Sequence, residues 1–171
     1  MTEKTFHSSL SYLLTTEAQT AKLADQLAHS ISKLAKQDPT LQLHISLIGD
    51  LGAGKTTFTR YLLKSLGHIG KVKSPTYALC EPYELAVNSH RLAVHHFDLY
   101  RMKYPEEWID AGFRDTFSSP GICLVEWPEK AEGTLPPVDC TITLDMNEDE
   151  SRQLDLTSHS NLGQALLNQI H

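Results

Sequence analysis

The fold of this 171-residue chain is decided by the stretch Gly49-Asp50-Leu51-Gly52-Ala53-Gly54-Lys55-Thr56. It matches the pattern G-x-x-x-x-G-K-[ST], which is typical of a phosphate-binding loop. Residues 43–48 before it alternate and are rich in β-formers, so they predict a strand. Residues 56–66 after it predict a helix that ends at Gly67. The motif therefore stands between the strand and the helix that it requires, which favours a phosphate site over an ordinary glycine turn.

Each residue type in the motif has a physical task. The glycines allow backbone conformations that a side chain would forbid, so that successive N–H groups point at phosphate oxygens. The N-terminus of the following helix adds partial positive charge. Lys55 is expected to reach the β- and γ-phosphates and the Thr56 hydroxyl to bind Mg²⁺. We predict that a nucleoside triphosphate contacts Asp50, Leu51, Gly52, Ala53, Gly54, Lys55, Thr56 and Thr57.

Composition bounds the class of protein. Hydrophobic residues make up 40% of the chain and charged residues 21%, values that are ordinary for globular proteins. The length suits one domain with a buried core. The chain does not begin like a signal peptide, and no apolar run approaches the length of a bilayer span. We therefore expect a single domain over residues 1–171 that is soluble, free of the membrane, cytoplasmic and monomeric when isolated.

The cysteines indicate the redox environment of the protein, and the net charge limits the classes of partner that it can bind. Cys80, Cys123 and Cys140 form no C-x-x-C pair, which favours buried free thiols in a reducing compartment. The formal net charge of −6 argues against a protein that binds nucleic acid by bulk electrostatics. A basic cluster does lie beside the loop, and we interpret it as a solvated helix face with counter-charge for phosphates. It consists of Arg60, Lys64, Lys71 and Lys73.

The remaining segments predict a small α/β domain. Residues 1–14 indicate a short edge strand, and Thr16-Glu17-Ala18-Gln19 has the form of a capping box that opens a helix ending at Asp38-Pro39. The start of that helix could lie near the nucleotide base. Segments 78–83 and 91–97, joined by a turn near Asn88-Ser89, predict an antiparallel pair, with Pro82 at or near a sheet edge.

Further along, Pro105 stands where a short helix would begin, and Gly112 where it would stop. Residues 121–125 form an apolar run typical of a buried parallel strand. Segments 139–144 and 153–157 predict two more strands, joined by an acidic turn, and 162–170 predict a terminal helix. The fold class is α/β, a three-layer domain like the P-loop NTPases, with a mixed parallel and antiparallel central sheet flanked by helices.

Two carboxylates stand where a metal ligand is needed. Mg²⁺ prefers oxygen ligands, and Asp98 and Glu126 each follow a predicted strand. One could hold the metal and the other orient a water, and the sequence leaves that division open. Thr76, in Ser74-Pro75-Thr76-Tyr77, lies where a switch segment would bring a hydroxyl to the γ-phosphate, with a plain Ser-Pro turn as the alternative.

Neighbouring side chains carry weaker signals. His95 and His96 should point to opposite faces of their strand, so one is expected to be buried and hydrogen-bonded and the other half-exposed. Trp127 follows Glu126 and is interpreted as a packing residue close to the nucleotide. No N-K-x-D or T-K-x-D stretch, L-S-G-G-Q signature or arginine-rich lid occurs, which argues against a guanine-specific GTPase, a transporter ATPase and a nucleotide kinase.

Four stretches together resemble one family. G-D-L-G-A-G-K-T-T at 49–57, S-P-T-Y at 74–77, H-F-D-L-Y-R at 96–101 and L-V-E-W at 124–127 are similar in order and spacing to the bacterial TsaE family, also called YjeE. The resemblance runs from about residue 15 to residue 157. It implies a small P-loop ATPase, using ATP and Mg²⁺, that is needed for threonylcarbamoyladenosine in tRNA next to the anticodon. Weak hydrolysis would drive or reset a complex with the partners TsaD and TsaB, through which the protein meets tRNA.

The resemblance also assigns roles by motif. Lys55 matches the phosphate lysine and Thr56 the Mg²⁺ ligand, while Glu126 matches the acidic residue that also contacts the metal. Asp98 matches the aspartate of H-x-D-x-Y-R and is expected at the metal too, and Thr76 matches the switch threonine. Lys55, Glu126, Asp98 and Thr76 are thus the expected catalytic residues. Glu17, which resembles a residue near the adenine, and Arg152 complete the expected nucleotide contacts.

Two other functions remain open on the sequence. A small-molecule or nucleoside kinase would need an acceptor pocket, which polar residues of the 100–114 segment could supply. A nucleotide-sensing module, in which hydrolysis is incidental, would keep its function when Glu126 is removed. Transfer of the γ-phosphate to an acceptor other than water separates the kinase from the ATPase.

Overall fold

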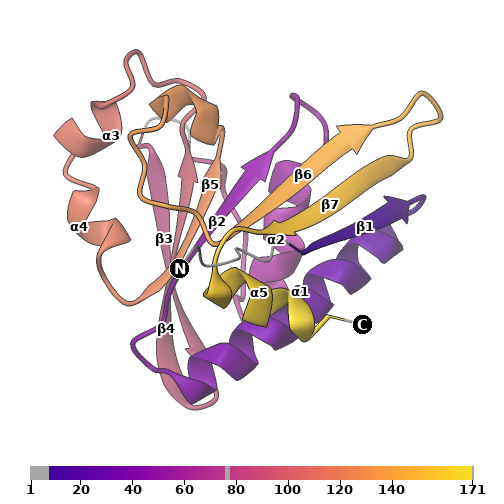
Figure 1. Cartoon of the computed structure of the whole chain (residues 1–171), viewed down its shortest axis with the longest axis horizontal. Helices are drawn as coiled ribbons and strands as arrows, with labels where there is room; N and C mark the ends of the chain where they lie inside the picture. Colours follow the sequence, from indigo (N-terminus) through magenta and orange to yellow (C-terminus); the bar gives the residue numbers. More distant parts are fainter. Residues whose placement is uncertain (1–7, 76–77, 171) are drawn as a thin grey trace, which may run out of the picture.

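The computed structural model describes residues 8–75 and 78–170. The helices and strands follow the chain in the order β1 (Ser9–Leu14), α1 (Glu17–Gln37), β2 (Gln42–Ile48), α2 (Lys55–Ser65), β3 (Cys80–Val87), β4 (His90–Asp98), α3 (Glu107–Asp110), α4 (Arg114–Phe117), β5 (Gly121–Glu126), the 3-10 helix η1 (Pro128–Ala131), β6 (Cys140–Met146), β7 (Arg152–Ser158) and α5 (Asn161–Asn168). Figure 1 shows their arrangement.

The strands form one mixed sheet in the order β1-β7-β6-β2-β5-β4-β3. The four central strands β6, β2, β5 and β4 are parallel, and antiparallel strands flank them on both sides. β2, which leads into the glycine-rich loop, therefore lies in the middle of the sheet. The predicted mixed α/β fold is confirmed.

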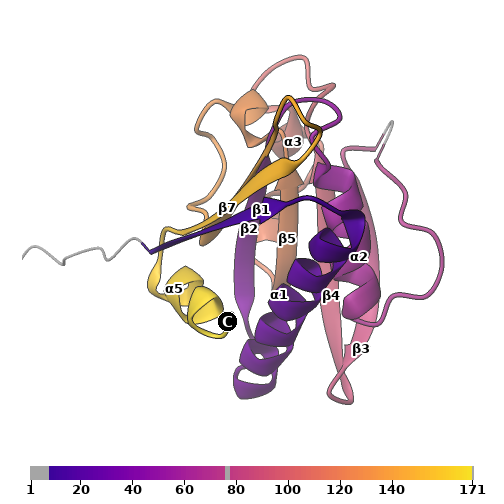
Figure 2. The same ribbon diagram turned by 90° about the vertical axis from the view of Figure 1, so that its right-hand side faces the viewer.

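Helices cover both faces of the sheet. The larger apolar core joins α1, α2 and α5 to one face, and a smaller core packs α3, α4 and η1 against the other (Figures 1 and 2). Every residue of β5 is buried, as expected for a strand covered on both sides. The register of β5 with its two neighbours places its last residue, Glu126, opposite Leu47 of β2 and Asp98 of β4.

Local signals explain two of the element boundaries, the start of α1 and the turn between β3 and β4. Thr16 caps α1 by accepting the N–H of Gln19 at 3.2 Å, but the Gln19 side chain accepts from the N–H of Thr15 rather than from that of Thr16. The second hydrogen bond of the predicted capping box, from the backbone to the Gln19 side chain, therefore comes from Thr15 and not from Thr16. Asn88 and Ser89 both have positive φ, the conformation of a tight turn between antiparallel strands.

The structure also tests the predictions for the edge strands, the short helix near Pro105 and the cysteines. The expected edge strands are confirmed, because β1 and β3 are the outer strands of the sheet. The helix expected to start at Pro105 begins instead at Glu107, after Glu106 at its N-cap. α4 and η1, each four residues long, were not expected, because so few residues show no helical period. Cys80, Cys123 and Cys140 are buried free thiols, as predicted.

Candidate functional site

The glycine-rich loop connects β2 to α2 and lies at the C-terminal ends of the parallel strands. α2 begins after Gly54, and no side chain among the described residues caps its first turn. Its first N–H groups are therefore available to a ligand, and the helix N-terminus favours an anion there. A methyl group on Gly49 would lie 2.4 Å from the carbonyl oxygen of Leu144, so the loop packs tightly against β6.

The Lys55 side chain is buried and folds back over the loop. Its Nζ donates to the carbonyl oxygens of Gly49 and Asp50 and lies 3.8 Å from the centroid of the Trp127 ring. Burial lowers the pKa of Lys55, and nearby carboxylates, Glu126 foremost, oppose that shift. An ammonium group whose partners are neutral carbonyls can exchange them for phosphate oxygens, which carry negative charge.

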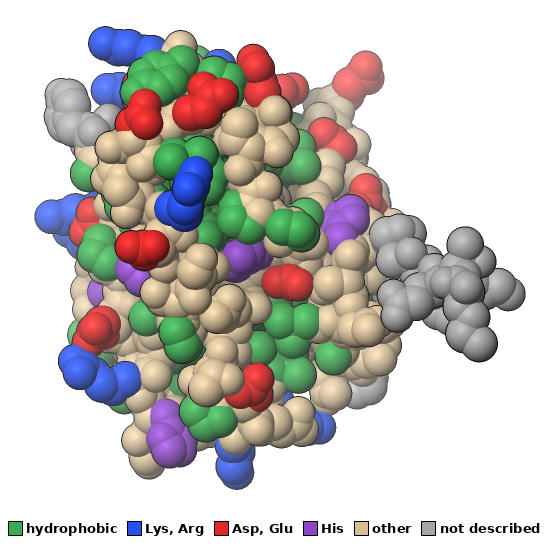
Figure 3. Space-filling model, turned by 60° about the vertical axis from the view of Figure 1, so that its left-hand side comes forward, with side chains coloured by type: hydrophobic (Ala, Val, Ile, Leu, Met, Phe, Trp, Pro, Cys, Tyr) green, Lys and Arg blue, Asp and Glu red, His purple; other side chains and the backbone are tan. Residues whose placement is uncertain are grey.

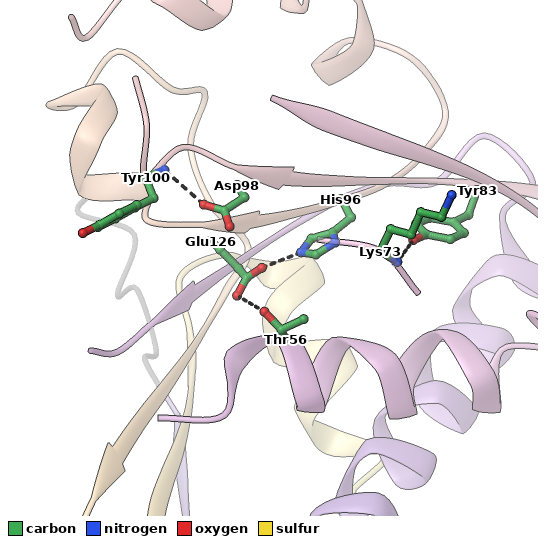
Figure 4. A network of polar contacts seen from close by, with 7 residues as sticks. All are labelled: Thr56, Lys73, Tyr83, His96, Asp98, Tyr100 and Glu126. Atoms are coloured by element: carbon green, nitrogen blue, oxygen red, sulfur yellow. Dashed lines mark hydrogen bonds and ion pairs between the residues drawn. The ribbon is translucent and has the colours of Figure 1, made fainter. Parts of the chain in front are cut away.

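Glu126 ends β5 and is 1% exposed. Its Oε1 accepts a hydrogen bond from Oγ1 of Thr56 at 3.2 Å, and its Oε2 lies 2.6 Å from Nε2 of His96 (Figure 4). Two oxygens in neighbouring positions around Mg²⁺, each at about 2.1 Å, lie about 3.0 Å apart. The spacing of the Thr56 and Glu126 oxygens therefore fits a magnesium site.

Asp98 lies beside Glu126 because β4 and β5 are parallel and pair these two residues directly. Its Oδ1 accepts the N–H of Tyr100 at 3.0 Å. Burial raises the pKa of Asp98, the Tyr100 N–H opposes the shift, and the charge of Glu126 adds to it. A carboxylate with a raised pKa accepts a proton more readily, which suits a group that acts on a water.

Two cavities at the C-terminal ends of the parallel strands share some of their lining residues. The first, about 230 Å³, is lined by the glycine-rich loop together with Asp98, Glu126 and Trp127. The second, about 190 Å³, is lined by the start of α1 and by Leu144 of β6. Gly54, Thr57 and Arg152 belong to both. A polyphosphate in the first cavity could therefore continue into a sugar and base in the second.

Comparison with known proteins identifies the family. The family model described as threonylcarbamoyl adenosine biosynthesis protein TsaE matches residues 14–154. The chain belongs to the TsaE family. A relative from Haemophilus influenzae, named tRNA threonylcarbamoyladenosine biosynthesis protein TsaE, is 40% identical over 159 residues, which cover 93% of this chain and 96% of the relative.

A sequence relative and a solved structure, both from Bacillus subtilis, are also similar to this chain. The sequence relative, also named tRNA threonylcarbamoyladenosine biosynthesis protein TsaE, is 36% identical over 126 residues, which cover 74% of this chain and 76% of the relative. The crystal structure of YdiB superposes with a TM-score of 0.70 at 26% identity and covers 96% of this chain and 95% of that one. Within the described part of this TsaE-family chain, no helix is long and apolar enough to cross a membrane.

In this TsaE-family chain, nearly all of the residues predicted from the glycine-rich motif line the first cavity. They are Asp50, Leu51, Gly52, Gly54, Lys55, Thr56 and Thr57. Ala53 is buried instead, and its carbonyl oxygen accepts from Nε of Arg152 at 3.1 Å. Glu17 lines the second cavity, where its Oε1 accepts from the Tyr61 hydroxyl at 2.7 Å. Thr76 lies outside the described residues.

One histidine of the His95/His96 pair is buried and hydrogen-bonded and the other half-exposed, as predicted, but the partners of His96 and Trp127 were not predicted from the sequence. His96 is the buried histidine of the pair and bonds to Glu126, whereas His95 is half-buried. Trp127, interpreted as a packing residue, lies against the Lys55 ammonium and lines the first cavity. The signal for His96 was its place two residues before Asp98, on the same face of one strand.

Proposed function

We propose that this TsaE-family protein binds ATP with Mg²⁺ and hydrolyses it slowly, as a regulatory ATPase in the biosynthesis of threonylcarbamoyladenosine in tRNA. The observation that carries the proposal is the meeting of Lys55, Thr56 and Glu126 at one uncapped helix N-terminus, with Asp98 beside them. The family assignment and the names of the relatives supply the pathway.

Each residue has a role that follows from its position. Mg²⁺, when bound, would supply positive charge next to the β- and γ-phosphate oxygens. Thr56 and Glu126 would hold it, since their oxygens are spaced as neighbouring ligands. Lys55 would leave the loop carbonyls and neutralise charge on the phosphates. Asp98 would orient the attacking water and accept its proton, which its raised pKa favours.

The expected partners are TsaD and TsaB, and the protein would reach tRNA through them. A formal net charge of −6 gives little general attraction for a polyanion. On the face shown in Figure 3, Lys and Arg side chains are interspersed with Asp and Glu and do not gather into one continuous basic area. A contact with tRNA that is mediated by partner proteins needs no such area.

The test is ATP hydrolysis by the purified protein with Mg²⁺, alone and with added TsaD and TsaB. We expect slow turnover alone, strong stimulation by the two partners, and loss of both in Lys55→Ala. Lys64→Ala is the matched control, because Lys64 is an exposed lysine in the last turn of the same helix. Partner-independent turnover at tens per second, typical of dedicated enzymes, would contradict the proposal.

One observation favours a second candidate, a small-molecule or nucleoside kinase. A third cavity of about 570 Å³ shares Leu51 and Asp98 with the first and is lined by Tyr100, Lys103 and Glu107. An acceptor held there would lie next to both Asp98 and Leu51 of the glycine-rich loop. Incubation with γ-labelled ATP and candidate acceptors decides the matter, because a phosphorylated product other than inorganic phosphate would favour the kinase.

A further inference from the structure

His96 and Thr56 hold the Glu126 carboxylate from two different elements. His96 lies on β4, is 0% exposed, and has its Nε2 2.6 Å from Oε2 of Glu126. Thr56 lies at the start of α2 and donates to the other oxygen, Oε1, at 3.2 Å. In Figure 4 two dashed contacts leave the Glu126 carboxylate in different directions, one to His96 and one to Thr56. The two carboxylate oxygens therefore have separate partners.

The register of the sheet explains why the histidine reaches this carboxylate. His96 pairs with Leu124 on β5, and Asp98 pairs with Glu126. Residues two apart on a strand share a face, so His96, Asp98 and Glu126 all project from the same side of the sheet. α2 packs on that same side of the sheet and carries Thr56 in its first turn. Phe97, between the histidine and the aspartate, belongs to the core on the opposite face.

The hydrogen-bond network indicates which ring nitrogen carries the proton. Nδ1 of His96 is buried and has no hydrogen-bond partner within residues 8–75 and 78–170. A proton on Nδ1 would be a buried donor without an acceptor, which is costly. A proton on Nε2 instead donates to the Glu126 carboxylate and leaves only a lone pair unmatched. The network therefore favours the tautomer of His96 that donates through Nε2.

We propose that His96 is a positioning residue of the metal site: it holds Oε2 of Glu126, so that Oε1 alone is presented beside the Thr56 hydroxyl to a divalent cation. The inference rests on the proposed ATP and Mg²⁺ function. Partners of this kind around a metal ligand restrict its rotation, and their loss typically lowers metal affinity by about 10- to 100-fold. Without His96, the buried carboxylate would lose one donor and could turn about its last torsion angle.

The test separates positioning from mere stability. The affinity for ATP is measured by calorimetry in EDTA and again in saturating Mg²⁺, and the melting temperature is recorded for each variant. His96→Gln keeps an N–H donor near the position of Nε2, whereas His96→Leu removes it. His95→Leu is the matched control, because His95 is the adjacent residue of β4 and is only half-buried.

We expect His96→Leu to need about ten times more Mg²⁺ for half of the Mg²⁺-dependent gain in ATP affinity, with little change in EDTA. His96→Gln and His95→Leu should stay within about three-fold of the unmodified chain. If His96→Leu fails to fold, His96→Asn replaces it, because its shorter amide cannot reach the carboxylate. An unchanged Mg²⁺ requirement in the donor-free variant would overturn the inference. Absence of any Mg²⁺-dependent ATP binding in the unmodified chain would overturn the proposed function, and the inference with it.

Discussion

The Lys55 ammonium lies 3.8 Å from the centroid of the Trp127 ring, within reach of a cation–π contact. Trp127 holds this position with φ of 58°, a left-handed conformation that is uncommon for a large side chain. The residue that follows Glu126 in the chain therefore packs against Lys55. A ligand whose phosphate oxygens bind Lys55 would move the ammonium group away from the Trp127 ring and so change the surroundings of the indole.

The first prediction follows from this contact. ATP binding should change the fluorescence of Trp127, because the adjacent ammonium group leaves the ring face. The chain has two tryptophans, and Trp108 is 2% exposed in the smaller core. We expect the ATP-dependent signal to survive in Trp108→Phe and to vanish in Trp127→Phe. A signal that follows Trp108 would show that the contact does not respond to the nucleotide.

The second prediction concerns Arg152, which connects the β6–β7 turn to the loop. Its Nε donates to the Ala53 carbonyl at 3.1 Å and its Nη1 to that of Glu150 at 3.0 Å. Because Arg152 also lines both cavities, Arg152→Ala should lower ATP affinity by about ten-fold, the loss of one charge-assisted hydrogen bond. Arg152→Lys should recover little, since it lacks the planar fork. Arg114→Ala, at an exposed position on α4, serves as the control in the same titration.

The third prediction is a pH dependence of stability. Burial raises the pKa of Cys80, Cys123 and Cys140 to about 12. Thiols in the unfolded chain ionise near pH 8.5, so above that pH the unfolded state releases protons that the folded state retains. The contribution of the thiols is fully present below about pH 8.5 and is lost as the pH rises toward 12. Urea unfolding should show the free energy of unfolding falling between about pH 9 and pH 11.

A thiol reagent offers an independent check of the same burial. At pH 8 the folded protein should react slowly at all three cysteines, and should react fully once denatured. Cys123→Ala should weaken the pH dependence by the share of one thiol. Rapid labelling of the folded chain would contradict the burial of these side chains.

The fourth prediction compares two glycines with positive φ. A methyl group on Gly121 would lie 2.4 Å from the carbonyl oxygen of Ala93, whereas one on Gly133 would meet no atom within 4 Å. Gly121→Ala therefore combines backbone strain with overpacking and should lower the free energy of unfolding by about 3 kcal/mol. Gly133→Ala keeps only the strain and should cost about 1 kcal/mol. Equal losses in urea unfolding would show that the close approach of β4 to Gly121 is relieved at no cost.

The sequence by itself determined the elements and the glycine-rich loop. Strand and helix periods, the Thr16 cap, the turn at Asn88-Ser89 and the G-x-x-x-x-G-K-T pattern depend on residues close together in the chain, and such signals are legible without a fold. The same locality explains the errors. A helix of four residues shows no period, and the two bonds of a cap can shift by one residue without changing its pattern.

The tertiary structure alone decided which side chains meet. Thr56 and Glu126 are 70 residues apart, His96 and Glu126 are 30 apart, and Arg152 reaches Ala53 across 99. Strand register and the packing of α2 against the sheet decide which of these residues meet. Neither can be predicted from residues that are close together in the chain. The choice of His96 over His95 shows the reason most simply. Both are histidines in one strand, and only the face that each presents to β5 and α2 distinguishes the partner of Glu126 from its half-buried neighbour.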